Sequence, residues 1–379
     1  MSALAYAQPR TGSRPTLTVD LGAVAANTAF LVGRVAGEVM AVVKADGFGH
    51  GMVDVARTAL AAGATRLGVT SLEEAGRLRE AGLRAPVLSW LNPVDADWAA
   101  ALAHGVDVAV PGRDHLDAVV RAAPGARVHL QVDTGMARDG AAPHRWADLC
   151  RAARAAERRG LVRVVGVMGH LACADQPGHP ANADGRARFA WAVATARAAG
   201  LRPADRHLAS TAAALLDPGS HHTLCRVGAG LVGIDPSGTT ALRAPLTLTA
   251  PLVDVRDVPA GCPVGYGHTW TAPAPTRLGL LPLGYADGLP RTASGRAEVL
   301  VRGRRRPVVG RISMDMTVVD LGADGTGAGE TVTVLGPGDD GGPTLREWAA
   351  WSGTIEHEIV TGLGARLVRT VRPAGPRGL

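Results

Sequence analysis

Lys44 ends a short apolar run, and this placement makes it a candidate for covalent chemistry. The run, residues 39–44, has the composition of a buried strand. Partial burial at the end of such a strand would lower the pKa of the lysine, because the ammonium form loses its hydration. A neutral amine is the form that condenses with an aldehyde cofactor to give a Schiff base. The alternative for this position is a lysine whose ammonium group extends into solvent.

Other polar side chains follow other apolar runs in the same manner. They are Asp133 and Arg138 after residues 127–132, His170 after 164–168, Ser210 and Thr211 after 206–209, and Arg226, Gly228 and Ala229 within 225–233. If these runs are parallel strands of one barrel, their carboxyl ends meet at one rim, where barrel enzymes place their chemistry. A lysine, two arginines and a histidine on one rim would suit an anionic ligand.

The elements that must position these residues are apolar runs alternating with alanine-rich amphipathic stretches. The runs are 39–44, 67–70, 87–90, 106–110, 127–132, 164–168, 206–209 and 225–233, and helical stretches between them include 52–62, 72–81, 146–159 and 183–199. Strands alternating with helices predict a parallel sheet. Eight strands in roughly 220 residues favour a (β/α)₈ TIM-type barrel over an open doubly wound sheet.

The texture of the sequence changes after about residue 238. Short β segments separated by Gly, Pro and Asp predict an all-β domain of hairpins, with one turn at 301–304 and a short helix at 345–351. The segment 16–20 suits either the start of the barrel or a strand of the β domain. We therefore expect an α/β chain with an N-terminal extension (1–15), a barrel (16–238) and a C-terminal β domain (239–379).

The composition argues against several classes of protein. Hydrophobic residues are 46% of the 379 residues and aromatic residues 3%, so alanine, valine and leucine must fill a large core. The net charge of +6 comes from scattered arginines, which favours a solvated basic surface over a nucleic-acid partner. No apolar run approaches the roughly 20 residues that span a bilayer, and we expect no membrane association.

The cysteines and the N-terminus indicate a location. Four cysteines without CxxC spacing argue against a zinc site and against a disulfide framework. The first 15 residues lack the apolar segment of a secretory signal. Together these features predict a cytoplasmic protein without a metal site, since free thiols persist in reducing compartments.

Six stretches, in order along the chain, resemble the motifs of the alanine racemase family. They are residues 42–51, 132–138, 169–175, 265–267, 284–291 and 310–315. The first resembles the family's attachment motif for pyridoxal 5'-phosphate, with Lys44 as the attached lysine. The resemblance implies a barrel followed by a β domain, and a head-to-tail homodimer whose active sites lie between subunits. It also implies racemisation of a small amino acid, with alanine as the first choice.

The resemblance assigns a role to each candidate residue. Lys44 would carry the cofactor and move a proton on the face used by the D-enantiomer, and Tyr266 of the partner subunit would serve the L-enantiomer. The residues implied in cofactor binding besides Lys44 are His170, Thr211, Arg226, Gly228, Ala229 and His357. Arg138 and the Met314 backbone N–H would hold the substrate carboxylate. Asp175, Tyr285, Arg291 and Arg311 match positions in the access corridor.

Four positions depart from the family pattern. Phe48 and His357 each replace a tyrosine that donates to the cofactor phosphate, Gln131 replaces a lysine that is carbamylated in many members, and Ser210 replaces an asparagine. Phe48 cannot donate a hydrogen bond, so we expect weakened cofactor binding. His357 also stands at a position that narrows the substrate pocket, which suggests a substrate other than alanine.

Other functions fit parts of the same pattern. A racemase for serine or another amino acid and a biosynthetic relative with other α-carbon chemistry both remain open. A basic amino-acid decarboxylase would need an acidic partner for the pyridine nitrogen, and Arg226 argues against it. A barrel-only cofactor carrier would lack the β domain with Tyr266 and Met314. The GxGxxG pattern at 228–233 lacks the surrounding βαβ unit of a dinucleotide site.

Overall fold

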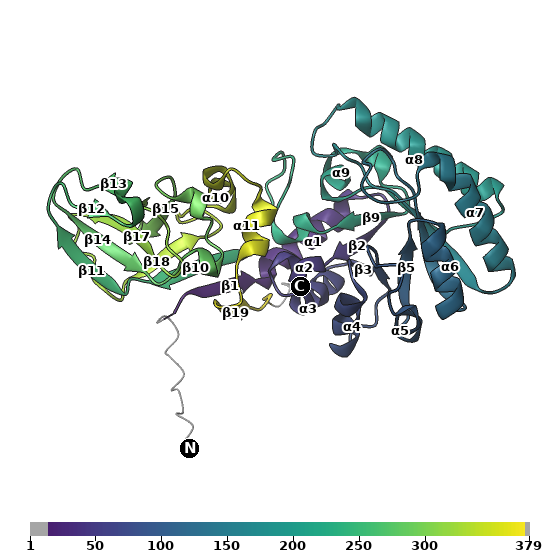
Figure 1. The fold of residues 1–379 in the computed structure, drawn as a ribbon, viewed down its shortest axis with the longest axis horizontal. Helices are drawn as coiled ribbons and strands as arrows, with labels where there is room; N and C mark the ends of the chain where they lie inside the picture. The colour runs from purple at the N-terminus through teal and green to yellow at the C-terminus, as the bar shows by residue number, and fades with distance from the viewer. Residues whose placement is uncertain (1–13, 376–379) are drawn as a thin grey trace, which may run out of the picture. The chain divides into compact units, whose positions relative to one another are not determined.

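The computed structural model describes residues 14–375, which form two compact units (Figure 1). One unit runs from Val24 to Leu242, and the other joins the residues up to Ala23 with those from Arg243 onward. Within the described part of the chain, no helix combines the length and the apolar character needed to cross a membrane.

The first unit contains eight parallel strands in the order β8-β7-β6-β5-β4-β3-β2-β9. They are β2 (Glu38–Val42), β3 (Arg66–Val69), β4 (Val87–Ser89), β5 (Val106–Val110), β6 (Ala126–Gln131), β7 (Val162–Met168), β8 (Asp205–His207) and β9 (Leu224–Val227). Backbone hydrogen bonds from Thr223 N to Arg206 O (3.2 Å) and from Arg226 N to Ala209 O (3.0 Å) join the two end strands. The sheet therefore forms the expected barrel, which is nearly closed.

Helices surround the barrel strands (Figure 1). They are α1 (Leu21–Arg34), α3 (Met52–Ala61), α4 (Leu72–Glu80), α5 (Trp98–Ala103), α6 (Arg113–Ala122), α7 (Pro143–Arg158), α8 (Pro180–Ala198) and α9 (Thr211–Leu216). The ends of α4 illustrate how the sequence stabilises these helices. Ser71 caps it by accepting from Glu74 N at 3.2 Å, acidic residues occupy its first turn, and Arg77 and Arg79 occupy its last turn.

Two of the expected strands end earlier than the apolar runs that predicted them. β2 ends at Val42, and Lys44 begins a separate tight turn, α2 (Lys44–Phe48). β9 ends at Val227, and the rest of that run forms the short 3-10 helix η2 (Ala229–Val232). Apolar composition alone does not mark these ends, because η2 is buried throughout and the turn after β2 is buried at Gly47 and Phe48.

The second unit is built on a nine-stranded sheet in the order β11-β14-β17-β16-β15-β18-β10-β1-β19. Its strands are β1 (Thr16–Asp20), β10 (Leu246–Pro251), β11 (Asp254–Val258), β14 (Thr276–Leu281), β15 (Glu298–Val301), β16 (Arg304–Val309), β17 (Thr317–Gly322), β18 (Thr331–Leu335) and β19 (Val368–Arg372). β1 runs antiparallel to β10 and parallel to β19. Of the two placements that suited residues 16–20, the structure has the strand of the β domain.

The turns and helices of this unit follow the sequence signals. Arg302 (φ 48°) and Gly303 (φ 73°) form the two-residue turn between β15 and β16 that was expected at 301–304. The short helix expected at 345–351 is α10 (Leu345–Ser352), whose N-terminus has a capping box between Thr344 and Glu347. A second helix, α11 (Glu356–Gly362), carries His357. A separate pair of short strands, β12 (Pro263–Val264) and β13 (Trp270–Thr271), encloses the turn with Tyr266.

Candidate active site

Lys44 lies just beyond the carboxyl end of β2 and is half-buried. It is also the only lysine in the chain, in which every other basic side chain of the Lys plus Arg total of 40 is an arginine. Burial lowers the pKa of the Lys44 ammonium group, and the positive charges of Arg138 and Arg226 lower it further, while Glu74 acts in the opposite direction. The site therefore favours the neutral amine that nucleophilic and proton-transfer chemistry require.

The backbone after Lys44 makes a left-handed turn, which is rare for residues with a side chain. The residues concerned are Ala45 (φ 51°), Asp46 (φ 53°), Gly47 (φ 64°) and Phe48 (φ 54°). Each non-glycine residue in this conformation costs about 1–2 kcal/mol. Hydrogen bonds hold the turn, since Glu74 Oε1 accepts from Ala45 N at 2.7 Å and Asp46 Oδ1 accepts from Met52 N at 3.1 Å. Such strain clusters at functional sites, where it fixes the direction of a side chain.

Arg226 lies on β9, which pairs directly with β2. Its terminal nitrogens donate to His207 Nδ1 (3.0 Å), His207 O (2.8 Å), Gly169 O (2.7 Å), His170 Nδ1 (3.2 Å) and Leu208 O (3.2 Å). Among residues 14–375, no hydrogen bond engages its Nε–H. Burial lowers the pKa of Arg226 to about 10, so the guanidinium stays protonated near neutral pH. One directed donor of a buried cation thus remains available to a ligand.

His170 is held neutral beside this cation. Burial, followed by the charges of Arg226, Arg138 and Lys44, lowers the pKa of His170 to about 3. Because its Nδ1 accepts from Arg226, the ring carries its hydrogen on Nε2. Thr134 Oγ1 also donates to the His170 carbonyl at 2.6 Å. The charges of Arg226, Arg138 and Lys44 all act on the His170 ring, so these four side chains share one neighbourhood of the barrel rim. Their positions at or near the carboxyl ends of strands predicted this.

The depressed pKa of His170 predicts how the stability of the cofactor-free protein depends on pH. Between pH 6.5 and the folded value of about 3, the unfolded chain takes up a proton at this ring and the folded chain does not. The neutral His170 ring therefore costs the folded protein no stability above pH 6.5. As the pH falls below 6.5, the free energy of unfolding decreases by up to about 1.4 kcal/mol per pH unit. Denaturant unfolding at pH 7.5 and pH 5 should show a smaller loss of stability for His170→Gln than for the wild type. An equal loss in both proteins would contradict this assignment.

Thr211, Gly228 and Phe48 form a second part of the rim. The Thr211 hydroxyl accepts from Gly228 N (3.3 Å) and Gly230 N (3.2 Å), so its own hydrogen can be donated to a ligand. A Cβ on residue 228 would lie 2.7 Å from two ring carbons of Phe48, and only glycine fits there. Ala229 is buried in the same turn. Backbone N–H groups and a hydroxyl gathered between two strand ends form the kind of loop that binds phosphate in barrels.

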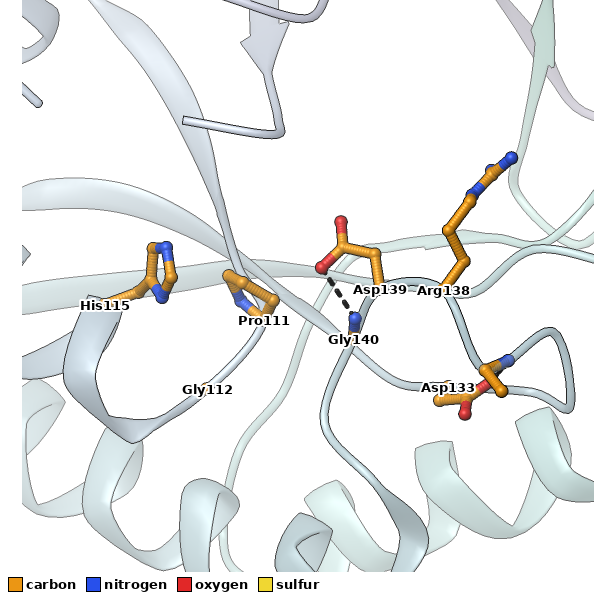
Figure 2. A pocket seen from close by; sticks show the side chains of 8 residues that line it. Pro111, Gly112, His115, Asp133, Arg138, Asp139 and Gly140 are labelled. Carbon is orange, nitrogen blue, oxygen red and sulfur yellow. Dashed lines mark hydrogen bonds between the residues drawn. The ribbon is translucent and has the colours of Figure 1, made fainter. Parts of the chain in front are cut away.

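Arg138 borders a cavity of about 420 Å³ with Asp133, Asp139 and His115 (Figure 2). Asp133 Oδ1 accepts from the backbone N–H groups of three following residues at 2.8–3.1 Å, which fixes the loop that carries Arg138. Gln131 Nε2 donates to Asp139 Oδ2 at 3.0 Å, while Gln131 Oε1 is buried without a partner among the described residues. Asp139 was missed in the sequence, although it directly follows Arg138. Gln131 thus orients a carboxylate, and its own buried oxygen remains available to a donor.

Tyr266 and Met314 lie together in the β unit. Both line a cavity of about 470 Å³ with Gly265, Ser313 and Met316. Tyr266 is 71% exposed and Met314 53% exposed. Met316 and Tyr285, whose backbone N–H donates to Ser313 O at 3.0 Å, are exposed as well. Positive φ angles at Gly265 (70°) and Gly267 (72°) shape the turn that presents Tyr266. This set of exposed apolar side chains is the mark of an interaction surface.

The remaining candidates have simpler surroundings. His357 lies in the first turn of α11, where its carbonyl accepts from Thr361 Oγ1 at 2.7 Å. Ser210 precedes α9 and makes no capping hydrogen bond. Between residues 14 and 375, the structure has no group of three or more His, Cys, Asp or Glu side chains arranged to hold a metal ion.

Comparisons with known proteins place this chain in a family. Residues 19–236 match the family model for the alanine racemase N-terminal domain and residues 245–371 that for its C-terminal domain. The chain is 46% identical over 368 residues to the alanine racemase of Frankia casuarinae, covering 94% of this chain and 96% of that one.

Solved structures agree with these matches. The alanine racemase from D-cycloserine-producing Streptomyces lavendulae superposes with a TM-score of 0.93 at 41% identity, covering 97% of this chain and 98% of that chain. That from Bartonella henselae, solved with covalently bound pyridoxal phosphate, gives a TM-score of 0.86 at 27% identity, covering 95% and 100%. The chain therefore belongs to the alanine racemase family.

Proposed function

We propose that this protein interconverts L- and D-alanine with pyridoxal 5'-phosphate as its cofactor. The observation that carries the proposal is the pairing of Lys44, the chain's only lysine and one with a lowered pKa, with the buried guanidinium of Arg226. The purified protein, supplied with cofactor, should racemise alanine faster than serine or larger amino acids in a chiral assay. A faster rate with another amino acid would show that alanine is not the preferred substrate. Exchange of the α-proton for deuterium without inversion would show that the reaction is not racemisation.

The donors and the amine found among the described residues suit this cofactor. The unpaired Nε–H of Arg226 offers one donor suited to a ring nitrogen. The Thr211 hydroxyl and the backbone N–H of Ala229 suit a phosphate, and we add His357 on the family pattern. The Gly228 N–H donates to Thr211 Oγ1 at 3.3 Å and would exchange this contact for one to the phosphate. Lys44 supplies the amine for a Schiff base. When bound, pyridoxal phosphate supplies an electron-accepting ring that makes the α-proton of an attached amino acid acidic.

Arg226 would limit how strongly the cofactor ring accepts electrons. A guanidinium donates hydrogen bonds and accepts none, so it cannot share a proton with a ring nitrogen as a carboxylate does. The five donations to carbonyls and imidazoles keep its orientation fixed. The cofactor ring would remain unprotonated, which makes it a weaker electron acceptor and disfavours side reactions such as transamination. This feature also argues against a decarboxylase.

Two bases are needed because the proton leaves one face of the α-carbon and returns to the other. Lys44 Nζ would serve one face, since its lowered pKa makes the neutral amine accessible. The phenol of Tyr266 from a second copy of the chain would serve the other. Arg138 would bind the substrate carboxylate through its two-pronged guanidinium, together with the backbone N–H of Met314.

A homodimer follows from the same assignment. Tyr266, Tyr285, Met314 and Met316 are exposed on the β unit, and a partner subunit would cover them. We therefore expect the β unit of one subunit to complete the site on the barrel unit (Val24–Leu242) of the other. Sedimentation or light scattering should give twice the chain mass. The four cysteines are free, which supports the cytoplasm as the location.

Phe48 gives a direct test of the proposed phosphate site. Its ring packs against Gly228, one of the proposed phosphate donors, but it has no hydroxyl to donate. Phe48→Tyr adds this hydroxyl, and a hydrogen bond to a charged group contributes about 1.5–3 kcal/mol, so the Kd for the cofactor should fall by about 10- to 100-fold. Reconstitution of the cofactor-free protein, followed by absorbance, measures this Kd. An unchanged or weaker affinity would place the phosphate elsewhere.

A further inference from the structure

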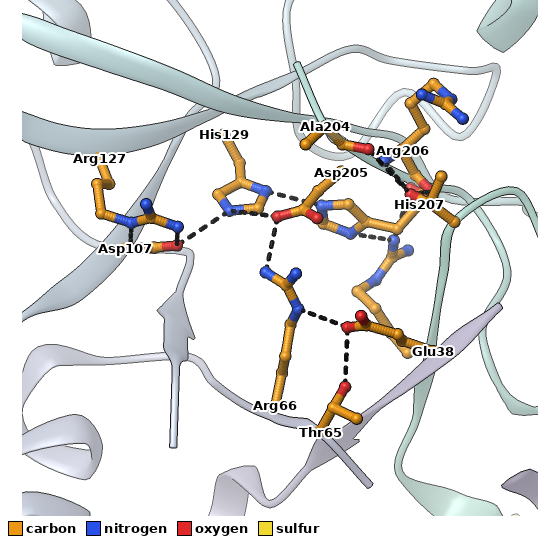
Figure 3. A network of polar contacts seen from close by, with 12 residues as sticks. Glu38, Thr65, Arg66, Asp107, Arg127, His129, Ala204, Asp205, Arg206 and His207 are labelled. Atoms are coloured by element: carbon orange, nitrogen blue, oxygen red, sulfur yellow. Dashed lines mark hydrogen bonds and ion pairs between the residues drawn. The ribbon is translucent and has the colours of Figure 1, made fainter. Parts of the chain in front are cut away.

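A chain of buried polar side chains begins at Arg226 and crosses the interior of the barrel. Figure 3 shows its part from His207 through His129 to Asp107. Arg226 Nη1 lies 3.0 Å from His207 Nδ1, and His207 Nε2 lies 2.9 Å from His129 Nδ1. His129 Nε2 then faces Asp107 Oδ2 at 3.5 Å and Asp205 Oδ2 at 4.0 Å. His129 and His207 are 1% and 0% exposed, so solvent cannot replace these contacts.

Arginines complete the far end of this chain. Asp107 receives a two-pronged interaction from Arg127, with Nε–Oδ1 at 2.7 Å and Nη2–Oδ2 at 3.2 Å. Asp205 is paired with Arg66 at 2.7 Å, and Arg66 in turn contacts Glu38 at 3.0 Å. Buried carboxylates persist when they are paired in this way. Both carboxylates of the network therefore have arginine partners within the chain.

Arg226 at one end of the chain and the carboxylates at the other determine which nitrogen of each histidine donates. Arg226 can only donate, so His207 Nδ1 must accept and its ring hydrogen must lie on Nε2. That hydrogen is donated to His129 Nδ1, which leaves the hydrogen of His129 on Nε2, facing the carboxylates. Reversing the ring of His129 or removing it would leave His207 Nε2–H without an acceptor. The orientation of His207 towards Arg226 thus depends on His129.

The barrel makes room for this arrangement at one backbone position. A Cβ on residue 166 would lie 1.9 Å from His129 Nδ1, so the glycine there leaves space for the imidazole. The rings of His129 and His207 meet edge to face, with their centroids 5.0 Å apart. Packing therefore holds His129 in the orientation that the hydrogen bonds require.

We propose that His129 is a positioning residue for the racemase, acting through His207 to keep the Arg226 guanidinium aligned on the cofactor ring nitrogen. The inference rests on the proposed function. Without His129, Arg226 would lose one oriented imidazole acceptor, and its contact with the ring nitrogen would loosen. The ring could then take up a proton and become a stronger electron acceptor. The expected consequence is more transamination, in which alanine is oxidised to pyruvate and the aldehyde-level carbon of the cofactor is reduced. The amino group stays on the cofactor as pyridoxamine phosphate, and starting from the Lys44 Schiff base one water is consumed.

The test compares three variants of the full-length holoenzyme. His129→Leu removes both nitrogens, and His129→Asn keeps an acceptor where Nδ1 faced His207. Leu116→Ala creates a cavity at a fully buried position of α6, outside the network, and matches the loss of stability. The measured quantity is pyridoxamine phosphate formed per racemisation turnover. This ratio is insensitive to a smaller amount of folded protein, because both products come from the same active molecules. The pH profile of the cofactor's visible absorbance and its Kd provide readouts independent of turnover.

His129→Leu should raise this ratio by about tenfold, shift the absorbance profile and lower kcat more than it changes KM for alanine. His129→Asn should restore most of the wild-type ratio, and Leu116→Ala should leave it unchanged. An unchanged ratio and absorbance profile in His129→Leu, or no rescue by asparagine, would overturn the proposal. If His129→Leu does not fold, Asp107→Asn is judged by the same ratio, with a rise supporting and no rise overturning it. A wild-type protein without racemase activity would instead refute the proposed function.

Discussion

Lys44→Ala should lower the rate of alanine racemisation by about 10⁴-fold or more, because it removes both the amine that attaches the cofactor and one of the two bases. No other lysine in the chain can substitute, since Lys44 is the only one. Initial rates in a chiral assay, at saturating cofactor, measure the loss. Arg113→Ala, which changes an exposed pair with Asp117 on α6, serves as the matched control and should retain the wild-type rate.

Chemical rescue separates a missing amine from a damaged fold. A small primary amine added to Lys44→Ala should restore part of the activity, because it can enter the space left by the side chain and accept the proton. The size of the rescue should follow the concentration of neutral amine as the pH is raised. Residual activity of Lys44→Ala above about one tenth of the wild-type rate would contradict the role of Lys44.

Tyr266→Phe should lower racemisation by about 10²- to 10⁴-fold, because it removes the proton carrier on one face of the α-carbon. The loss should be asymmetric. If Lys44 serves the D-enantiomer, D-alanine in deuterated water should still exchange its α-proton in the variant, whereas L-alanine should lose this exchange. Nuclear magnetic resonance of each enantiomer measures both rates.

The exchange of D-alanine is an internal control for the fold and for cofactor binding. Loss of both exchange reactions in a correctly dimeric Tyr266→Phe protein would mean that Tyr266 acts on both faces or supports the structure. Undiminished racemisation would exclude it as a base. Because Tyr266 is 71% exposed on its own unit, the substitution should change the stability of the monomer very little.

Positions at the ends of strands were the predictable part of this site. Lys44 ends an apolar run, His170 follows one and Arg226 lies within one. Parallel strands bring such positions to one rim whatever their separation in sequence. A stronger signal for Lys44 was overlooked. In a chain that uses arginine at every other basic position, a single lysine indicates a need for an amine that can lose its proton.

Other features depend on long-range packing and could not be read from local sequence. Asp46 and Gly47 are turn-forming types, but Ala45 and Phe48 rarely adopt left-handed angles, so their types did not predict a left-handed turn of this length after Lys44. β1 pairs with a strand some 350 residues away, and its alternation suited either unit equally. His129 meets His207 across 78 residues, because closing the barrel brings their strands' interior faces together. The role of Tyr266 came from the family resemblance, since an exposed tyrosine has no intrinsic signal of catalysis.

Borohydride reduction of the holoenzyme tests the central claim most directly. Reduction fixes a Schiff base as a stable amine, and peptide mapping by mass spectrometry then locates the attached pyridoxyl group. We predict one group per chain, on the peptide that contains Lys44, with loss of activity in proportion to labelling. Since the chain has no other lysine, the only competing amine is the N-terminus. An active enzyme that carried no pyridoxyl group on Lys44 after reduction would contradict the account.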